Sequence, residues 1–439
     1  MVPVCDKCGV ESESGQPFPK KRKAFRKKEE SHCPDCLKKR ERSEKRTVFF
    51  WAMLVFIVAV LVSKEAQGTS FVQVLINWGV TVYVLIPLSV FAHELGHALA
   101  AVTCRFRLFS VELGWHGKEL FNCRILGTRW ILRWFPESGL CRSASPKLDH
   151  LRWRFFLVVA AGPLTNLLII ALIVLNKPSG TLLSLGPYLR EFDLLYLLFW
   201  SNVFLLLSSL RKKDYCTSIG EVHSDGSQLL RLLKNDQKLL EESHKAYFIF
   251  TAADFLSEEQ YSKAESALSE GLELYPNDVG LEITRCDILY RLDNIDLARD
   301  QLTTILEKTD PKDSLLPTIK NNLAYYIAVL GDEQRYPEAD ILSTEALQAQ
   351  EAASHVIGTR GSVLIRLGRA KEGLDLLNKS IKECTSEEGR GENLTWVAFA
   401  YWKLNAHDKA RDYLQQARSL APKFPLFDEV TRLLDAQSN

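Results

Sequence analysis

The first forty-odd residues of this 439-residue chain lack any long apolar run. A secretory signal peptide carries its apolar segment close to the amino terminus, so this region does not have the pattern of one. We therefore expect the amino end to lie in the cytosol. The chain also has almost no net charge, at +1, but its charges are unevenly distributed. Residues 20–46 are strongly basic, whereas the carboxy-terminal half is mixed and slightly acidic.

Charged side chains are also missing from the apolar stretch 71–102, except in the motif His-Glu-Leu-Gly-His at 93–97. Ionisable groups at membrane depth are costly and usually functional. On a helix the imidazoles of His93 and His97 project from one face, where a zinc ion can bridge them. The motif therefore predicts a zinc hydrolase with Glu94 as its general base. The alternative is a chance match that only lines a polar contact between helices.

Four apolar runs, at about 48–63, 71–103, 155–175 and 192–210, are long enough, or nearly so, to span a membrane. The loops after the first and third runs carry few basic residues, whereas the segments after the second and fourth are rich in them. The positive-inside rule then places both termini in the cytosol and the His-Glu-Leu-Gly-His motif near the cytosolic end of its helix. We expect a multi-pass protein of a bacterial cytoplasmic membrane.

A zinc hydrolase commonly uses three protein ligands and leaves a fourth position to water. The residues just after His97 offer no third ligand, and Glu191 and Asp193 lie about a bilayer thickness away in this topology. The remaining carboxylates are Glu112, Glu119, Glu137, Asp149, Asp214, Glu221 and Asp225. Asp225 is favoured because Ser-Asp-Gly at 224–226 is a turn that precedes an amphipathic pattern, although this turn also fits a helix N-cap.

Three motifs together resemble the site-2 proteases, which are membrane-embedded zinc metalloproteases. They are His-Glu-Leu-Gly-His at 93–97, Ala-Gly-Pro-Leu-Thr-Asn at 161–166 in the next apolar run, and Asp-Gly at 225–226 followed by Gln-Leu-Leu. The resemblance covers about residues 48–233, and the combination is far more specific than any one motif. It implies a catalytic zinc ion with Asp225 as the third ligand.

The chain departs from the family pattern before this third ligand. Asn202 matches an asparagine that family members carry before the aspartate, but no proline follows it and the gap to Asp225 is longer. His223 is therefore a competing ligand. Asn166 and Asn202 are candidate substrate-binding residues, for the unwound backbone or the developing oxyanion. Alternatively, both serve only as hydrogen-bonding contacts between spans.

Residues 105–154 mix tryptophans with arginines, and the piece 128–135 has the composition of a strand. Such content suits a membrane interface. The resemblance implies a small β-rich element here, whose exposed edge would hold an unwound substrate as an added strand. A surface-lying amphipathic segment without a substrate role is the alternative.

Two Cys-x-x-Cys pairs near the amino end predict a zinc ribbon, formed by Cys5, Cys8, Cys33 and Cys36. A cytosolic location disfavours disulfides. This second zinc would be structural, since four thiolates close its coordination sphere. The basic insert between the pairs has the charge to contact nucleic acid or anionic lipid, but a solvated topology determinant explains it without a ligand. We expect the lipid bilayer as a partner of the protein and do not expect nucleic acid.

From about residue 238 a helical pattern recurs at spacings near 34 residues, with small residues at equivalent positions: Ala264, Ala298, Ala339, Gly373 and Ala410. This resembles the tetratricopeptide repeat, two antiparallel helices per unit, with about five units present. Such an array makes a concave surface that suits peptides, so we expect a protein or peptide partner. The alternative is that the hairpins pack in this way whatever they bind.

These patterns predict a mainly α protein in three parts. A cytosolic zinc ribbon with a basic insert occupies 1–46, a membrane-embedded metalloprotease domain 47–236, and an α-solenoid of repeats 237–439. The expected function is hydrolysis of peptide bonds in membrane-protein substrates, with the repeats recruiting partners or substrates. The alternative is a proteolytically inactive, membrane-anchored scaffold that acts through its repeats.

Overall fold

The computed structural model describes most of the chain after residue 70. The described residues are 71–114, 119–134, 138–177, 182, 192–212, 214–217, 220–311, 313–350, 353–384 and 386–436, with two short paired strands near the amino end, β1 (Lys20–Arg22) and β2 (Glu29–Ser31). The predicted zinc ribbon of Cys5, Cys8, Cys33 and Cys36 lies outside the described residues, as do the apolar run 48–63 and Glu137.

Two helices are long and apolar enough to cross a membrane, Val72–Thr103 and Leu151–Asn176. The first contains α2 (Phe71–Val80), a π-helical turn (Thr81–Leu85) and α3 (Ile86–Thr103), and the second is α4 (Leu151–Asn176). The run at 192–210 forms a shorter apolar helix, α7 (Leu194–Leu210). The described residues thus hold two of the four predicted spans at full length.

The apolar windows of the two long helices are only 28% and 33% buried. A helix in the core of a soluble protein is covered on most of its surface, whereas these helices present large apolar side chains outward. Leu168 and Leu172 on α4 and Phe204 on α7 are more than half exposed. Such a surface is typical of helices that face lipid.

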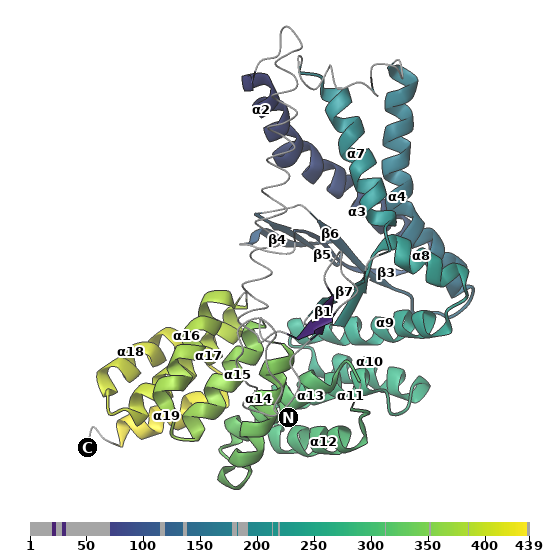
Figure 1. Ribbon diagram of the computed structural model, residues 1–439. Coiled ribbons are helices and arrows are strands. Elements are labelled where there is room, and N and C mark those ends of the chain that lie inside the picture. The colour runs from purple at the N-terminus through teal and green to yellow at the C-terminus, as the bar shows by residue number, and fades with distance from the viewer. Residues whose placement is uncertain are drawn as a thin grey trace. The chain divides into compact units, whose positions relative to one another are not determined.

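A small mixed sheet follows α3 in the chain (Figure 1). Its strands are β3 (Arg107–Leu113), β4 (Glu119–Ile125), β5 (Thr128–Arg133) and β6 (Gly139–Ala144), in the order β4-β5-β3-β6. β3 runs parallel to β5 and antiparallel to β6. Leu126 and Gly127, both with positive φ, close the tight β4–β5 hairpin. The predicted β-rich element is therefore confirmed as a sheet, with β6 at one edge.

A short hairpin of β7 (Asp214–Thr217) and β8 (Gly220–His223) leads into α8 (Asp225–Leu233). The side chain of Ser224 caps α8, because its oxygen accepts a hydrogen bond from the Ser227 N–H at 3.3 Å. Asp225 consequently occupies the first turn of the helix and is not its cap.

Helical hairpins make up the rest of the chain, as the repeat pattern predicts (Figure 1). The helices are α9 (Gln237–Ser257), α10 (Tyr261–Leu274), α11 (Val279–Arg291), α12 (Ile295–Lys308), α13 (Leu316–Leu330), α14 (Tyr336–Ala349), α15 (Ser354–Arg366), α16 (Ala370–Glu383), α17 (Glu387–Lys403), α18 (His407–Arg418) and α19 (Pro425–Asp435). Sequential pairs from α9 to α18 give five units, and α19 packs on the last of them.

The small residues of the repeat pattern lie where two helices approach closely. Ala264, Ala298, Ala339 and Ala410 are completely buried. Gly373 replaces alanine because a Cβ there would lie 2.6 Å from Ile365 on α15.

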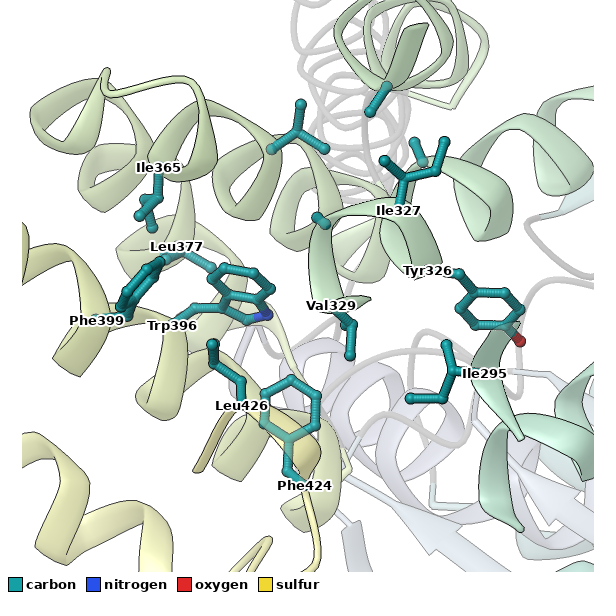
Figure 2. Close-up of a cluster of buried hydrophobic side chains, with 14 of the residues drawn as sticks. Ile295, Tyr326, Ile327, Val329, Ile365, Leu377, Trp396, Phe399, Phe424 and Leu426 are labelled. Atoms are coloured by element: carbon teal, nitrogen blue, oxygen red, sulfur yellow. The ribbon is translucent and has the colours of Figure 1, made fainter. Parts of the chain in front are cut away.

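The core of the repeats continues from one unit to the next. Figure 2 shows Trp396 and Phe399 of α17 packed beside Phe424 and Leu426. The ring centroids of Trp396 and Phe399 are 6.0 Å apart.

Candidate metal centre

Three side chains singled out in the sequence lie together, His93 and His97 from α3 and Asp225 from α8. The Nε2 atoms of the two histidines are 3.1 Å apart. Oδ2 of Asp225 lies 3.0 Å from Nε2 of His93, and Oδ1 lies 3.5 Å from Nε2 of His97. Both imidazoles are 8% exposed. The two histidines, four residues apart on α3, thus meet an aspartate from a helix that starts more than a hundred residues later in the chain.

These separations fit a shared zinc ion. Ligand atoms at about 2.0–2.1 Å from a tetrahedral zinc are about 3.3–3.4 Å from one another. The distances of 3.0–3.5 Å between the two imidazoles and the carboxylate bracket that value. Two histidines and one carboxylate are also a donor set that catalytic zinc takes, with one position left for water. The residues present therefore fit the metal.

The second ring nitrogen of each histidine has a partner that orients the ring. Nδ1 of His93 lies 2.5 Å from Oδ1 of Asn166, and Nδ1 of His97 lies 2.8 Å from the carbonyl oxygen of Val158. Because both partners are acceptors, each Nδ1 carries the proton and each Nε2 keeps its lone pair toward Asp225. Hydrogen bonds of this kind position metal-binding imidazoles.

Asn166 is held in turn by a buried chain of polar groups. Its Nδ2 donates to Oδ1 of Asn202 at 2.8 Å, and Nδ2 of Asn202 donates to Oγ of Ser89 at 3.1 Å. Both asparagines are completely buried. Ser89 lies one turn before His93 on the same face of α3. The two candidate substrate-binding asparagines therefore belong to the hydrogen-bond network around the metal-ligand candidates, and their binding of substrate stays a prediction.

Two glycines allow the helices to approach this point. A Cβ at position 162 on α4 would lie 2.3 Å from Nε2 of His97, so only glycine fits beside the imidazoles. A Cβ at position 226 would lie 1.9 Å from the carbonyl oxygen of Leu210 at the end of α7. Gly226 therefore lets α8 begin against that helix end, which places the adjacent Asp225 within reach of the histidines.

The predicted general base, Glu94, is 6% exposed and lies beside the sheet. The backbone of Cys141 in β6 hydrogen-bonds to its carboxylate, and Gly139 in the same strand packs against it. The edge strand β6 thus passes directly beside Glu94, the residue that follows His93.

The other ligand candidates are engaged elsewhere. His223 Nε2 lies 2.6 Å from the Arg231 guanidinium, and Glu112 and Glu119 pair with Arg133. Within the described part of the chain, His93, His97 and Asp225 form the one group of three that could hold a metal, and Asp149 is not part of it. The side chains of Asp214 and Glu221 are not among those described.

Three residues contribute to this site although the sequence motifs did not identify their roles. Val158 acts through its backbone carbonyl, which no sequence pattern reveals. Ser89 was detectable in principle, because it is a polar residue in an apolar helix at a spacing of four from His93 and eight from His97. Gly162 belongs to the quoted motif, but its close contact with the imidazoles depends on how α4 crosses α3.

Comparison with solved structures finds tetratricopeptide repeat proteins. A thermophilic TPR protein of Thermus thermophilus is 16% identical, over 43% of this chain and 98% of that one, with a TM-score of 0.34. YrrB, a TPR protein with an unusual peptide-binding site, is 16% identical over 45% of this chain and 97% of its own, with a TM-score of 0.28. The APC/C hetero-tetramer Cut9–Hcn1 is 16% identical over 66% of this chain and 49% of that one, with a TM-score of 0.35. No curated protein sequence matches the chain.

The family comparison concerns the part of the chain that holds the metal-ligand candidates. The model of peptidase family M50 matches residues 81–359, which is more than half of the chain and includes His93, His97 and Asp225. The resemblance to site-2 proteases rests on the same residues. This chain belongs to peptidase family M50.

Proposed function

We propose that the protein is an intramembrane zinc metalloprotease that cleaves membrane-protein substrates. The observation that carries the proposal is the convergence of His93, His97 and Asp225 beside Glu94, in a chain of a metallopeptidase family. A buried imidazole pair that only bridged two helices would not need a carboxylate on its Nε2 side and acceptors on both Nδ1 atoms.

The residues divide the chemistry between them. A zinc ion bound by His93, His97 and Asp225 would polarise the scissile carbonyl and acidify a water molecule. Glu94 takes the proton of the attacking water and passes it to the leaving amine nitrogen. Asn166 and the Val158 carbonyl keep both Nε2 atoms unprotonated and aimed at the centre.

The edge strand β6 offers a way to hold the substrate. A helical substrate shields its carbonyls within its own hydrogen bonds, so the segment to be cut has to unwind first. An unwound segment can pair with the free side of β6 by strand addition. Because Glu94 packs against Gly139 in β6, such a segment would lie beside the general base. We therefore expect substrates with helix-weakening residues near the cleaved bond.

The exposed apolar faces of α4 and α7 support a place in the bilayer. We propose four spans, at 48–63, 71–103, 155–175 and 192–210, with both termini in the cytosol and the centre near the cytosolic side. A zinc ribbon at Cys5, Cys8, Cys33 and Cys36 would hold a second, structural zinc on that side.

The repeats would recruit partners or substrates, and they are joined closely to the sheet. Asp254 of α9 accepts a hydrogen bond from Arg107 of β3 at 2.9 Å. The Phe109 ring lies 5.4 Å from the Phe250 ring, and Nε2 of His244 lies 3.3 Å from the Pro146 carbonyl oxygen. A protein bound by the repeats would therefore be held on the sheet side of the metal centre.

Metal content tests the centre directly. The purified full chain should hold two zinc ions, and Asp225→Ala and Cys36→Ser should each remove a different one. Elemental analysis of the single and double variants checks this. A chain that holds only the ribbon zinc would refute the protease and leave the scaffold that acts through its repeats.

Turnover needs a separate experiment, which compares membrane proteomes of cells that carry the wild type, Glu94→Gln or Glu273→Gln. Glu273 is an exposed residue of α10 and serves as the matched control. Glu94→Gln should keep both zinc ions while a membrane protein accumulates uncut. If no protein accumulates under many growth conditions, the scaffold function is favoured.

A further inference from the structure

The repeat domain contains a groove of about 960 Å³ whose function the metal centre does not explain. Its walls come from α9, α11, α13, α15 and α17 and from the segment that leads into α19. The floor is aromatic, since the Tyr290 and Tyr326 rings stack at 5.1 Å and the Tyr325 ring lies 6.1 Å from Tyr290. Phe424 stacks in parallel on Tyr325 at 6.5 Å.

Two carboxyls lie among these rings. Glu392 of α17 accepts hydrogen bonds from the Tyr290 hydroxyl at 3.2 Å and the Tyr325 hydroxyl at 2.7 Å. Asp287 of α11 accepts one from the Tyr326 hydroxyl at 3.2 Å and a longer one from Nδ2 of Asn322 at 3.5 Å. Burial raises the pKa of Asp287 to about 6 and also raises the pKa of Glu392. Each carboxyl thus has phenol partners, which compensate a negative charge only in part.

The cations of the groove already have other partners. Arg291 pairs with Glu388 and acts on Asp287 and Glu392 only from beyond ion-pair distance, and Nζ of Lys423 lies 3.0 Å from Glu259. Burial lowers the pKa of His355, which keeps that imidazole neutral at pH 7. Among the described residues, no lysine or arginine forms an ion pair within 4.0 Å of either Asp287 or Glu392.

A separate observation points to a hydrogen-bond donor that comes from outside the chain. Asn321 of α13 lines the groove and is 4% exposed, and its Oδ1 accepts no hydrogen bond from any residue that the structure describes. A buried acceptor without a donor costs about 1–3 kcal/mol. Asp287, Glu392 and Asn321 are therefore all acceptors. The one N–H among their side-chain partners is the long contact from Asn322 to Asp287, and neither carboxyl has an ion-pair partner within 4.0 Å among the described residues.

We propose that this groove binds a partner protein through an arginine side chain in an extended peptide segment. The guanidinium carries five N–H donors in one plane, which suits the carboxylate and amide oxygens that line the groove. The Tyr290 and Tyr325 rings, which also line it, add cation–π attraction. The inference rests on the partner-binding part of the proposed function and is independent of hydrolysis.

Charge complementarity selects this occupant. An acidic peptide would meet Asp287 and Glu392 with like charge, and an apolar one would leave Asn321 and both carboxyls buried without donors from the peptide. Arginine supplies both the positive charge and the N–H donors that these acceptors take, and the aromatic lining favours its planar group over the compact ammonium of lysine.

The test uses two fluorescein-labelled peptides, Gly-Ala-Arg-Ala-Arg-Ala-Gly and the same peptide with citrulline at both arginines. Citrulline keeps the shape of arginine but carries no charge. Fluorescence anisotropy with the full chain in detergent should show binding of the arginine peptide and at least about tenfold weaker binding of the citrulline peptide. Asp287→Asn and Glu392→Gln should each weaken binding of the arginine peptide about tenfold or more.

Asp375→Asn is the matched control, because it removes one exposed negative charge on α16 outside the groove. It should change the affinity less than about twofold. Equal binding of the two peptides, or equal effects of Asp375→Asn and the groove variants, overturns the proposal, and so does a failure of the arginine peptide to bind. Circular dichroism of each variant verifies that the helices remain folded.

The outcome is separable from the fate of the proposed protease. Glu94→Gln should bind the arginine peptide as the wild type does. Loss of peptide binding with both zinc ions and cleavage retained would refute the groove alone, whereas normal peptide binding with no catalytic zinc would refute the protease alone.

Discussion

Replacing Asp287 with asparagine should stabilise the repeats at neutral pH while it weakens arginine-peptide binding. The change keeps the size of the side chain and an oxygen that can accept the Tyr326 hydroxyl. It removes a half-buried charge that has no ion-pair partner within 4.0 Å among the described residues and feels Arg291 only from farther away. Ligand sites commonly contain residues that lower the stability of the fold and are needed for binding.

The direction and magnitude of this stability change follow from the pKa of Asp287, which burial raises from an ordinary value of 3.8 to about 6 in the folded chain. The folded state therefore holds its proton more tightly than the unfolded state, and the wild type loses stability as the pH rises from about 4 to 6. A shift of about two units corresponds to about 3 kcal/mol, and water in the groove reduces this to about 1–2 kcal/mol. The stability of Asp287→Asn should not fall in this way as the pH rises from about 4 to 6.

Hydrogen exchange followed by mass spectrometry measures this effect in the full chain, because peptides from α11 and α13 report the local free energy of opening. The measurement compares wild type and Asp287→Asn between about pH 4 and 7.5, after correction for intrinsic exchange rates. Glu392 and His355 also have shifted pKa values, but their contributions cancel in the difference between the two chains. A difference that stays constant across this range, or a less stable variant at pH 7, would contradict the assignment of a carboxylate whose charge is destabilised by the fold.

Three further predictions concern the metal centre and the core. In a Cys36→Ser background, Asn166→Ala should lower zinc affinity about 10–100-fold through loss of the His93 orientation, measured by competition with a chromophoric chelator; unchanged affinity would contradict a positioning role. Gly162→Ala should abolish that zinc site, because the new methyl group would lie 2.3 Å from a ligand nitrogen. Gly79→Ala, which has no neighbour within 4 Å, is its control, and zinc retained by both variants would contradict the packing. Leu302→Ala, at a completely buried site, should destabilise the repeats by about 2–5 kcal/mol in hydrogen exchange; a loss below about 0.5 kcal/mol would contradict its place in the core.

The parts of the fold that the sequence predicts well are those set by local spacing. The apolar run around His93 forms a helix that continues past Pro87, because this proline lies in the first turn of α3, just after the π-helical turn. The small residues of the repeats mark close contacts between paired helices. Both features repeat with the period of a helix, so they can be read from neighbouring residues alone. Even Gly373, a departure from the repeat pattern, has a local cause in Ile365.

Other parts depend on contacts between distant segments. The parallel pairing of β3 and β5 places β6 at an edge beside Glu94, and nothing in the composition of residues 105–154 specifies that strand order. Asn166 is another case, since its sequence position allowed substrate binding or interhelical contact but did not reveal that Oδ1 faces the ring of His93. Such contacts arise from helix crossings, which periodicity does not encode.

The groove on the repeats could not be predicted either, because it too depends on contacts between distant segments. Tyr325 and Glu392 are 67 residues apart and lie in separate repeats, and neither stands out in its own helix. Only the superhelical stacking of the repeats brings them together.

The metal centre and the groove are alike in their physical chemistry. Each gathers ionisable side chains at a buried or half-buried site: His93, His97 and Asp225 converge on one point, and Asp287 and Glu392 line one groove. Burial of such sets costs free energy unless a positive charge joins them. A compact divalent ion fits ligand atoms separated by 3.0–3.5 Å, whereas a groove of about 960 Å³ with an aromatic floor requires a larger, planar cation. The size of each site therefore fits the cation proposed for it, zinc between His93, His97 and Asp225 and arginine on the repeats.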